Sequence, residues 1–150
     1  MSLFLTNRWA LRFVGLGLIA LITAGCGGGA PYEQVPVTGK VTYEDGSLIP
    51  AARISITFAP QAPSIDRKTH PRPAMAEVNV ADGTFKNVTT RKFDDGATIG
   101  PNKVLIVSYD RQDNQTNAVP AIYRSVDSTP LKIEITPDDT HFELKVRKSK

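Results

Sequence analysis

Few side chains in this chain of 150 residues could support hydrolytic chemistry. A serine or cysteine nucleophile needs a general base within hydrogen-bond reach, and histidine is the most common base. The sequence has two histidines: His70 lies in a proline-rich segment, and His141 follows a polar stretch near the end. Neither stands beside a recognisable nucleophile motif. We therefore predict that the chain has no catalytic residue and is not an enzyme.

Two acidic segments could supply the oxygen ligands that calcium prefers. One contains Asp94 and Asp95, and the other contains Asp110 and Asp113. Neither has the ligand spacing of an EF-hand, so we interpret these four carboxylates as solvated turn residues. A zinc site would need several cysteine or histidine ligands, which the sequence does not offer. We predict neither a metal site nor a cofactor.

The only cysteine, Cys26, stands between an apolar run and three glycines. A lone cysteine forms neither an internal disulfide nor a zinc site. Residues 1–25 have no acidic residue, carry Arg8 and Arg12, and hold the apolar run 13–24. That run is shorter than the roughly 20 apolar residues of a membrane-spanning helix. A basic start, a short apolar core and a small-residue exit predict a secretory signal peptide over residues 1–25.

The exit of this segment, Thr23-Ala24-Gly25-Cys26, resembles the lipobox of bacterial lipoproteins. In that family the chain is cleaved before the cysteine, whose thiol carries a diacylglyceryl group. The resemblance implies that Cys26 is the lipid-attachment residue, although Thr23 stands where leucine is usual. The alternative is an ordinary secretory signal followed by a free thiol.

Residues 26–35 are rich in glycine and proline without periodicity, which predicts a flexible, lipidated tether. By resemblance to lipoprotein sorting, Gly27 after the cysteine favours the outer membrane where one exists. We expect a protein of the cell envelope that is lipid-anchored to the outer membrane or faces the periplasm.

The charge balance argues against a nucleic-acid partner. The chain has 18 Lys and Arg against 15 Asp and Glu, and loss of Arg8 and Arg12 leaves 16 against 15. A nucleic-acid-binding protein would carry a basic face interleaved with aromatic residues, and we find none. We predict that residues 148–150 are a solvated basic tail; contact of the tail with anionic lipid or cell-wall phosphate is the alternative.

From residue 36 onward the apolar residues follow a period of two, which is typical of β-strands. The pattern predicts about seven strands, at residues 37–43, 53–58, 76–80, 84–89, 103–109, 131–135 and 142–146. No segment after residue 30 has convincing helical spacing.

Turn signals separate these segments. Asp82-Gly83 is predicted to form a two-residue hairpin turn, with further turns at Asp45-Gly46 and Asp95-Gly96. Residues 59–74 hold four of the eleven prolines and are predicted to be a loop. This spacing predicts one all-β domain over residues 36–147, a β-sandwich, with a small barrel as the alternative.

The order of these motifs resembles transthyretin-like and carboxypeptidase-regulatory-like domains. VTGKVTYEDGSLIPAARISITFAP is similar to their opening strands and D-G turn, and ADGTFKNVT to the following hairpin. VPAIYRSVDSTPLKIEIT resembles the closing part. The resemblance implies a single Greek-key β-sandwich and no activity, because the regulatory domain of that family is not catalytic. It also extends to small bacterial lipoproteins.

Three tyrosines are candidates for stacking on a sugar: Tyr32 in the tether, Tyr109 at the end of a core strand, and Tyr123. We interpret Tyr123 as packing over an edge of the sandwich. Trp9 leaves with the signal peptide, so the mature chain has no tryptophan.

Two functions from different classes follow. The first is a membrane-anchored lipoprotein that acts as a non-catalytic structural or interaction module. Its partners would be the bilayer, through Cys26, and an envelope protein or glycan, which a sheet edge could pair with or contact. The second is a ligand-binding lipoprotein, for carbohydrate, peptide or calcium. It predicts a concave site at one end of the sandwich, between the loops at 59–73 and 110–120.

Overall fold

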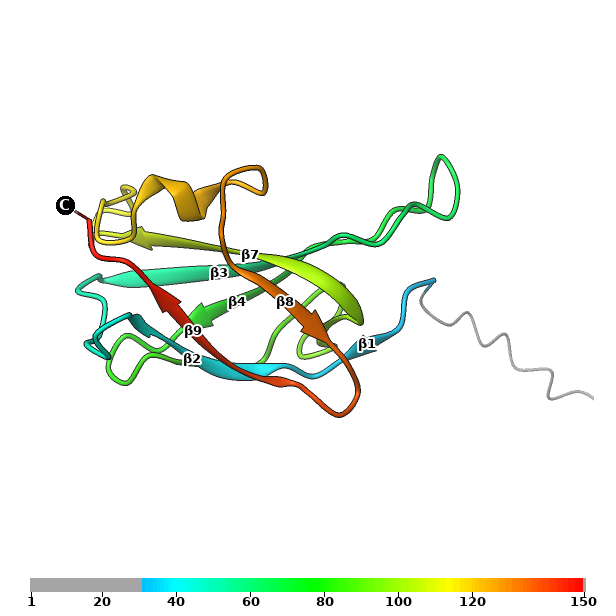
Figure 1. The fold of residues 1–150 in the computed structure, drawn as a ribbon, viewed down its shortest axis with the longest axis horizontal. Coiled ribbons are helices and arrows are strands. Elements are labelled where there is room, and N and C mark those ends of the chain that lie inside the picture. Colours follow the sequence, from blue (N-terminus) through cyan, green and yellow to red (C-terminus); the bar gives the residue numbers. More distant parts are fainter. Residues whose placement is uncertain (1–30, 150) are drawn as a thin grey trace, which may run out of the picture.

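The predicted all-β class is confirmed by a computed structural model, which describes residues 31–149. This part of the chain forms a curled seven-stranded sheet and a separate two-stranded sheet (Figure 1). The strands are β1 (Gln34–Val35), β2 (Thr38–Tyr43), β3 (Arg53–Pro60), β4 (Ala74–Val78), β5 (Thr84–Phe85), β6 (Ala97–Thr98), β7 (Gly100–Tyr109), β8 (Lys132–Ile135) and β9 (His141–Val146).

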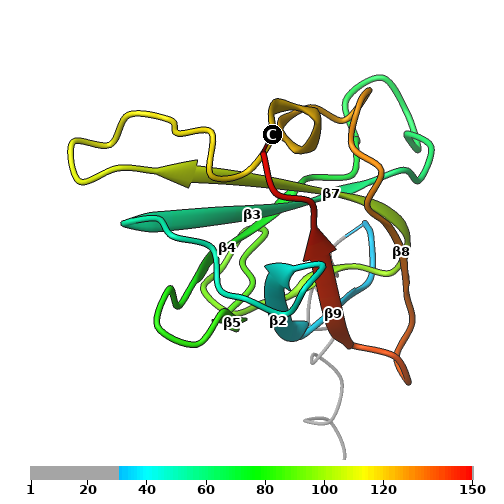
Figure 2. The ribbon, with the colours of Figure 1, turned by 60° about the vertical axis from the view of Figure 1, so that its left-hand side comes forward.

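The strands of the large sheet follow the order β8-β7-β3-β4-β5-β2-β9, so β8 and β9 form its edges. Neighbours are antiparallel, except that β2 and β9 run parallel. The β4–β5 ladder has one residue pair, Val78 with Phe85, and Met75 of β4 also bridges to Thr89 beyond β5. At this narrow joint the sheet curls, and Figure 2 shows β3 and β7 on one side with β2 and β9 on the other.

The period of two predicted the buried face correctly. Ile54, Ile56 and Phe58 of β3 are buried, and the residues between them are partly exposed. The ring of Phe58 lies against that of Phe85 in β5, with centroids 5.7 Å apart. Few backbone hydrogen bonds connect the two sides of the sheet at the narrow joint. The packing of core side chains therefore connects them.

All seven predicted strands are present, with shifted ends. The prediction of a two-residue turn at Asp82-Gly83 was wrong. Four residues, 80–83, separate Asn79 from Thr84, and the Asn79 N–H donates to the Thr84 carbonyl at 2.7 Å. Gly83 N–H closes the turn on the Asn79 carbonyl at 2.7 Å, with Gly83 at φ +80°. Asp82 Oδ1 accepts from the Thr84 N–H at 2.8 Å. The side chain of Asp82 thus stabilises a wider turn than the Asp-Gly pair indicates.

Two short features, the β1–β6 pair and η1, were not expected from the sequence. β1 pairs with β6, residue Val35 opposite Ala97, and Gly96 (φ +88°) lies so close to the Val35 carbonyl that a Cβ would collide with it. The second is η1 (Ala121–Arg124), a single turn of 3₁₀-helix after Pro120. Both are too short to show periodicity. Between residues 31 and 149 no helix is long and apolar enough to span a bilayer.

Candidate functional site

Cys26, the predicted lipid-attachment residue, and the predicted signal peptide lie outside the described residues. The structure does show where the chain that follows Cys26 meets the domain. Within the expected tether, residues 26–35, Tyr32 contacts the domain through its side chain and Gln34–Val35 through β1. The surface around Tyr32 is therefore the part of the domain that the anchor would hold.

Tyr32 binds the proline-rich loop between β3 and β4. This loop, residues 61–73, is called the arm here; it projects from the sheet as two adjacent segments (Figure 1). The Tyr32 hydroxyl lies 3.0 Å from the Pro63 carbonyl and 3.2 Å from the Thr69 carbonyl, and accepts the Ile65 N–H at 3.1 Å. The Ile65 N–H also reaches the Thr69 carbonyl at 3.1 Å. Tyr32 thus fastens the start of the domain to both sides of the arm.

The tip of the arm is a turn that Asp66 stabilises. Its carboxylate accepts the N–H of Lys68 at 2.7 Å and that of Thr69 at 2.8 Å, and the Thr69 hydroxyl at 3.0 Å. The hydrogen bond from Lys68, followed by those from Thr69, lowers the pKa of Asp66. The negative charge of Asp66 is therefore directed at the backbone of the arm.

A serine does lie beside His70, which the sequence did not indicate. Ser64 Oγ is 2.6 Å from His70 Nδ1, and His70 Nε2 is 3.0 Å from the Arg67 carbonyl. Both Ser64 and His70 are exposed, so bulk water would surround any charge that developed there, and the pair lacks the dry setting that strengthens catalytic dipoles. We interpret the pair as a structural hydrogen bond that connects the two segments of the arm. His141 begins β9 and bonds Thr38 Oγ1 at 3.1 Å.

The two loops that sequence analysis combined into one ligand site lie at opposite ends of the sheet. The β3–β7 ladder runs from Arg53 opposite Tyr109 to Pro60 opposite Asn102. The arm follows Pro60, whereas the loop at 110–120 follows Tyr109. At about 3.3 Å per residue, this ladder separates them by roughly 23 Å. The predicted site between them was therefore wrong, because the antiparallel register was not visible in the sequence.

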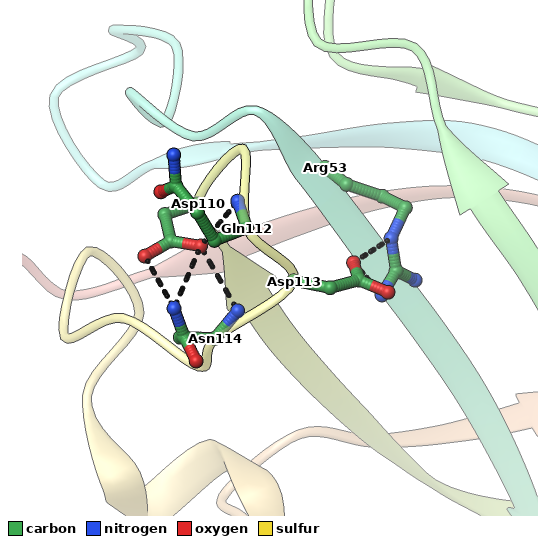
Figure 3. Close-up of polar contacts among 5 residues, drawn as sticks. All are labelled: Arg53, Asp110, Gln112, Asp113 and Asn114. Atoms are coloured by element: carbon green, nitrogen blue, oxygen red, sulfur yellow. Dashed lines mark hydrogen bonds and ion pairs between the residues drawn. The ribbon is translucent and has the colours of Figure 1, made fainter.

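The acidic residues of the 110–120 loop each have a protein partner (Figure 3). Asp110 accepts the backbone N–H groups of Gln112 at 2.8 Å and Asn114 at 2.9 Å. Asp113 points the other way, to the Arg53 guanidinium at 2.7 Å. The backbone and side-chain hydrogen bonds from Asn114 lower the pKa of Asp110. The two carboxylates do not converge on a shared cation position, and their contacts fit the interpretation as turn residues.

Asp95 also binds backbone amides. Its carboxylate accepts the N–H groups of Thr90 at 2.6 Å, Arg91 at 2.9 Å and Lys92 at 2.8 Å. Burial raises the pKa of Asp95, but these hydrogen bonds outweigh it, so the pKa lies below its usual value. Asp94 is exposed beside it, with φ +60°. Within residues 31–149, no three His, Cys, Asp or Glu side chains are grouped closely enough to hold a metal.

We expect acid to destabilise the domain through these turns. Hydrogen bonds to the charged form hold the pKa of Asp66, Asp82 and Asp110 below their usual values, and Asp95 has the same net direction. Each stabilises the fold above its unfolded pKa of about 4, and this contribution is lost as the pH falls through the lower folded pKa. Thermal unfolding followed by circular dichroism should therefore give a falling midpoint from about pH 5 to pH 2. A midpoint that holds steady or rises over this range would contradict the turn contacts.

The tyrosines that were candidates for sugar stacking have structural partners. Tyr123 is 2 % exposed, and its hydroxyl accepts the Arg147 N–H at 3.0 Å, next to the edge strand β9. The Arg53 guanidinium lies 3.9 Å from the centroid of the Tyr109 ring. These two side chains, and the hydroxyl of Tyr32, therefore make contacts within the protein.

Two hollows lie on the described surface. One, of about 450 Å³, lies between η1 and residues 147–149 and includes Ile122. The other, of about 680 Å³, lies beside the β4–β5 hairpin and includes Phe93, which is 80 % exposed, with Glu77 and Lys86. Small-molecule sites enclose most of their ligand and place a few convergent polar groups. We see no such convergence among the described residues that line either hollow.

No protein-family profile, no curated protein and no solved structure matches this chain.

Proposed function

We propose that the protein is a cell-envelope lipoprotein, anchored to a membrane through an acylated Cys26, whose domain is a non-catalytic structural or interaction module. The observation that carries this proposal is the order of a basic start, a short apolar run and Thr23-Ala24-Gly25-Cys26, with Cys26 the only cysteine. A single acyl chain binds a bilayer weakly, whereas the two or more of a lipoprotein anchor make attachment stable. The partners are the bilayer and an envelope protein or glycan.

We also propose that the domain is a Greek-key β-sandwich of the transthyretin-like class. The short β4–β5 ladder, with Val78 and Phe85 as its one pair, supports a division into two layers, β8-β7-β3-β4 and β5-β2-β9. The contact of Phe58 with Phe85 supports the same division, because it joins residues of the two layers across the core. The order of motifs along the chain is the further support.

A module without its own chemistry fits the contacts of the polar side chains. Asp66, Asp95 and Asp110 stabilise turns, and the Ser64–His70 pair is exposed to water. The ligand-binding alternative has less support, because the loops expected to form its site lie at opposite ends of β3 and β7.

The edge strand β9 is a candidate surface for a protein partner. Thr38 N–H donates to the Thr140 carbonyl and Glu44 N–H to the Val146 carbonyl, so even-numbered residues of β9 direct their backbone groups to β2. The odd-numbered residues direct theirs outward: these are His141, Glu143 and Lys145. Charged side chains at an edge discourage indiscriminate strand pairing. A strand added here would need charges that complement this row.

The anchor is tested by the mass of the membrane-extracted protein. The wild-type chain should start at Cys26 and carry added acyl mass, and Cys26→Ser should lose that mass because serine offers no thiol to acylate. Thr23→Leu is the matched control: it brings the segment closer to the usual lipobox and should be processed at least as completely. A wild-type chain that keeps residues 1–25, or starts at Cys26 without added mass, would contradict the lipoprotein proposal.

A further inference from the structure

The tip of the arm carries uncompensated positive charge. Arg67, Lys68 and Arg72 are exposed, while the only acidic residue of the arm, Asp66, is bound to the turn backbone and Thr69. In the part of the chain that the structure describes, none of these three cations forms an ion pair. With three basic residues and one acidic residue, and histidine counted as neutral, the arm has a net charge of +2.

The same tip exposes an apolar side chain. Ile65 is 61 % exposed and comes directly before Asp66 in the turn. Burial of such a side chain in an apolar phase is favourable. An apolar side chain among basic ones is typical of segments that lie in the interface of a membrane with anionic lipids.

Tyr32 places this tip close to the expected anchor. Six residues of chain lead from Cys26 to Tyr32, and they span at most about 21 Å when fully extended. The Tyr32 hydroxyl contacts the arm at Pro63, Ile65 and Thr69, on both sides of the tip. The loop at 110–120 lies roughly 23 Å farther away along β3 and β7. An acylated Cys26 would therefore hold the arm, rather than the far loop, near the bilayer.

We propose that the arm is a second membrane contact, in which Arg67, Lys68 and Arg72 meet anionic phospholipid headgroups and Ile65 enters the interface. This inference rests on the proposed lipid anchor, which brings the arm to the surface. The contact would fix one orientation of the domain, with the arm toward the bilayer and the 110–120 loop and η1 away from it. Salt at 0.1 M screens the attraction between basic residues and anionic lipid beyond about 10 Å. The contact therefore requires that Tyr32 hold the arm close to the bilayer.

The test uses one introduced tryptophan, because the only native one, Trp9, lies in the predicted signal peptide. Ile65→Trp keeps an apolar side chain at the tip and reports its surroundings through fluorescence. Mature lipoprotein is purified and reconstituted into vesicles of phosphatidylcholine with phosphatidylglycerol, or of phosphatidylcholine alone. We expect emission at shorter wavelength on the anionic vesicles only, and a return toward the aqueous wavelength at about 1 M salt, where charges are screened beyond roughly 3 Å.

Matched variants separate the arm from the rest of the surface. In the Ile65→Trp background, Arg67→Gln should lower the ratio of membrane-bound to unbound arm about fivefold, because it removes one basic residue near an anionic surface. Arg111→Gln, an equivalent change at the opposite end, should leave it unchanged. Ile122→Trp places the probe on η1, at a side chain 49 % exposed, and its emission should not respond to vesicles.

Flotation of the vesicles distinguishes the two proposals. Protein that does not float with the vesicles would show that the anchor itself is absent. If the protein floats, but the emission of the Ile65→Trp variant responds no more than that of Ile122→Trp, the anchor stands and the arm contact is overturned. An equal shift on neutral vesicles would overturn the role of the three cations. A shift seen only after addition of alginate, an anionic polysaccharide, would assign the arm to a wall polymer instead.

Discussion

Phe58→Ala is expected to lower the free energy of unfolding by about 4 kcal/mol. Phe58 is 0 % exposed in the core, and its ring contacts Phe85 of β5. The backbone ladders on both sides of β3 prevent the sheet from collapsing into the space that the ring leaves, so a cavity remains. Since domains of this kind are stable by about 5–15 kcal/mol, the loss is a large part of the total. Urea unfolding followed by circular dichroism measures it.

Phe93→Ala is the control, because it removes the same atoms from a ring that is 80 % exposed. We expect its effect to stay within about 0.5 kcal/mol. Similar losses for the two variants would show that Phe58 does not join the two sides of the sheet as described.

Gly39→Ala should cost about 3 kcal/mol, although it adds only one methyl group. Gly39 lies in β2 between Phe85 of β5 and Phe142 of β9. A Cβ there would lie 2.7 Å from Phe85 Cζ and would collide with the Phe142 carbonyl oxygen. The carbonyl belongs to the backbone of β9 and cannot move away without disturbing the parallel ladder. Urea unfolding measures this loss on the same scale as Phe58→Ala.

Gly46→Ala is the matched control for this steric argument. Gly46 has φ +82°, but no atom lies within 4 Å of the position of its Cβ. Alanine there should lower the free energy of unfolding by only about 1 kcal/mol, the cost of the left-handed backbone conformation for a residue with a Cβ. A larger loss at Gly46 than at Gly39 would falsify the close packing of β2 against β9.

The two ends of the domain have different character, and this bears on where a partner would bind. The arm end contains Tyr32, which is six residues from Cys26, and it carries the uncompensated charge. The opposite end contains η1, the 110–120 loop and the hollow beside Ile122. If the anchor and the arm contact hold, the far end and the edge of β9 stay accessible to an envelope protein or glycan.

Much of the fold could be predicted because alternation is a local property. A strand with one buried face must place apolar residues at every second position, so residues 53–58 and 142–146 show their structure without knowledge of their neighbours. The proline-rich segment was likewise predicted to be a loop, since proline cannot donate a hydrogen bond to a sheet ladder. The lipid anchor at Cys26 also depends on local order alone, and it stays a prediction.

The tertiary structure alone decided which distant segments meet. β2 pairs in parallel with β9, although Thr38 and its partner His141 are 103 residues apart, and no local pattern encodes that pairing. The same holds for the bond of Tyr32 to the arm and for the separation of the arm from the 110–120 loop. Periodicity shows which face of a strand is buried, but strand order and register depend on the whole core packing together. The sequence by itself therefore determined the class of the fold, and tertiary contacts such as that of Tyr32 with the arm determined which surface would lie beside the proposed anchor.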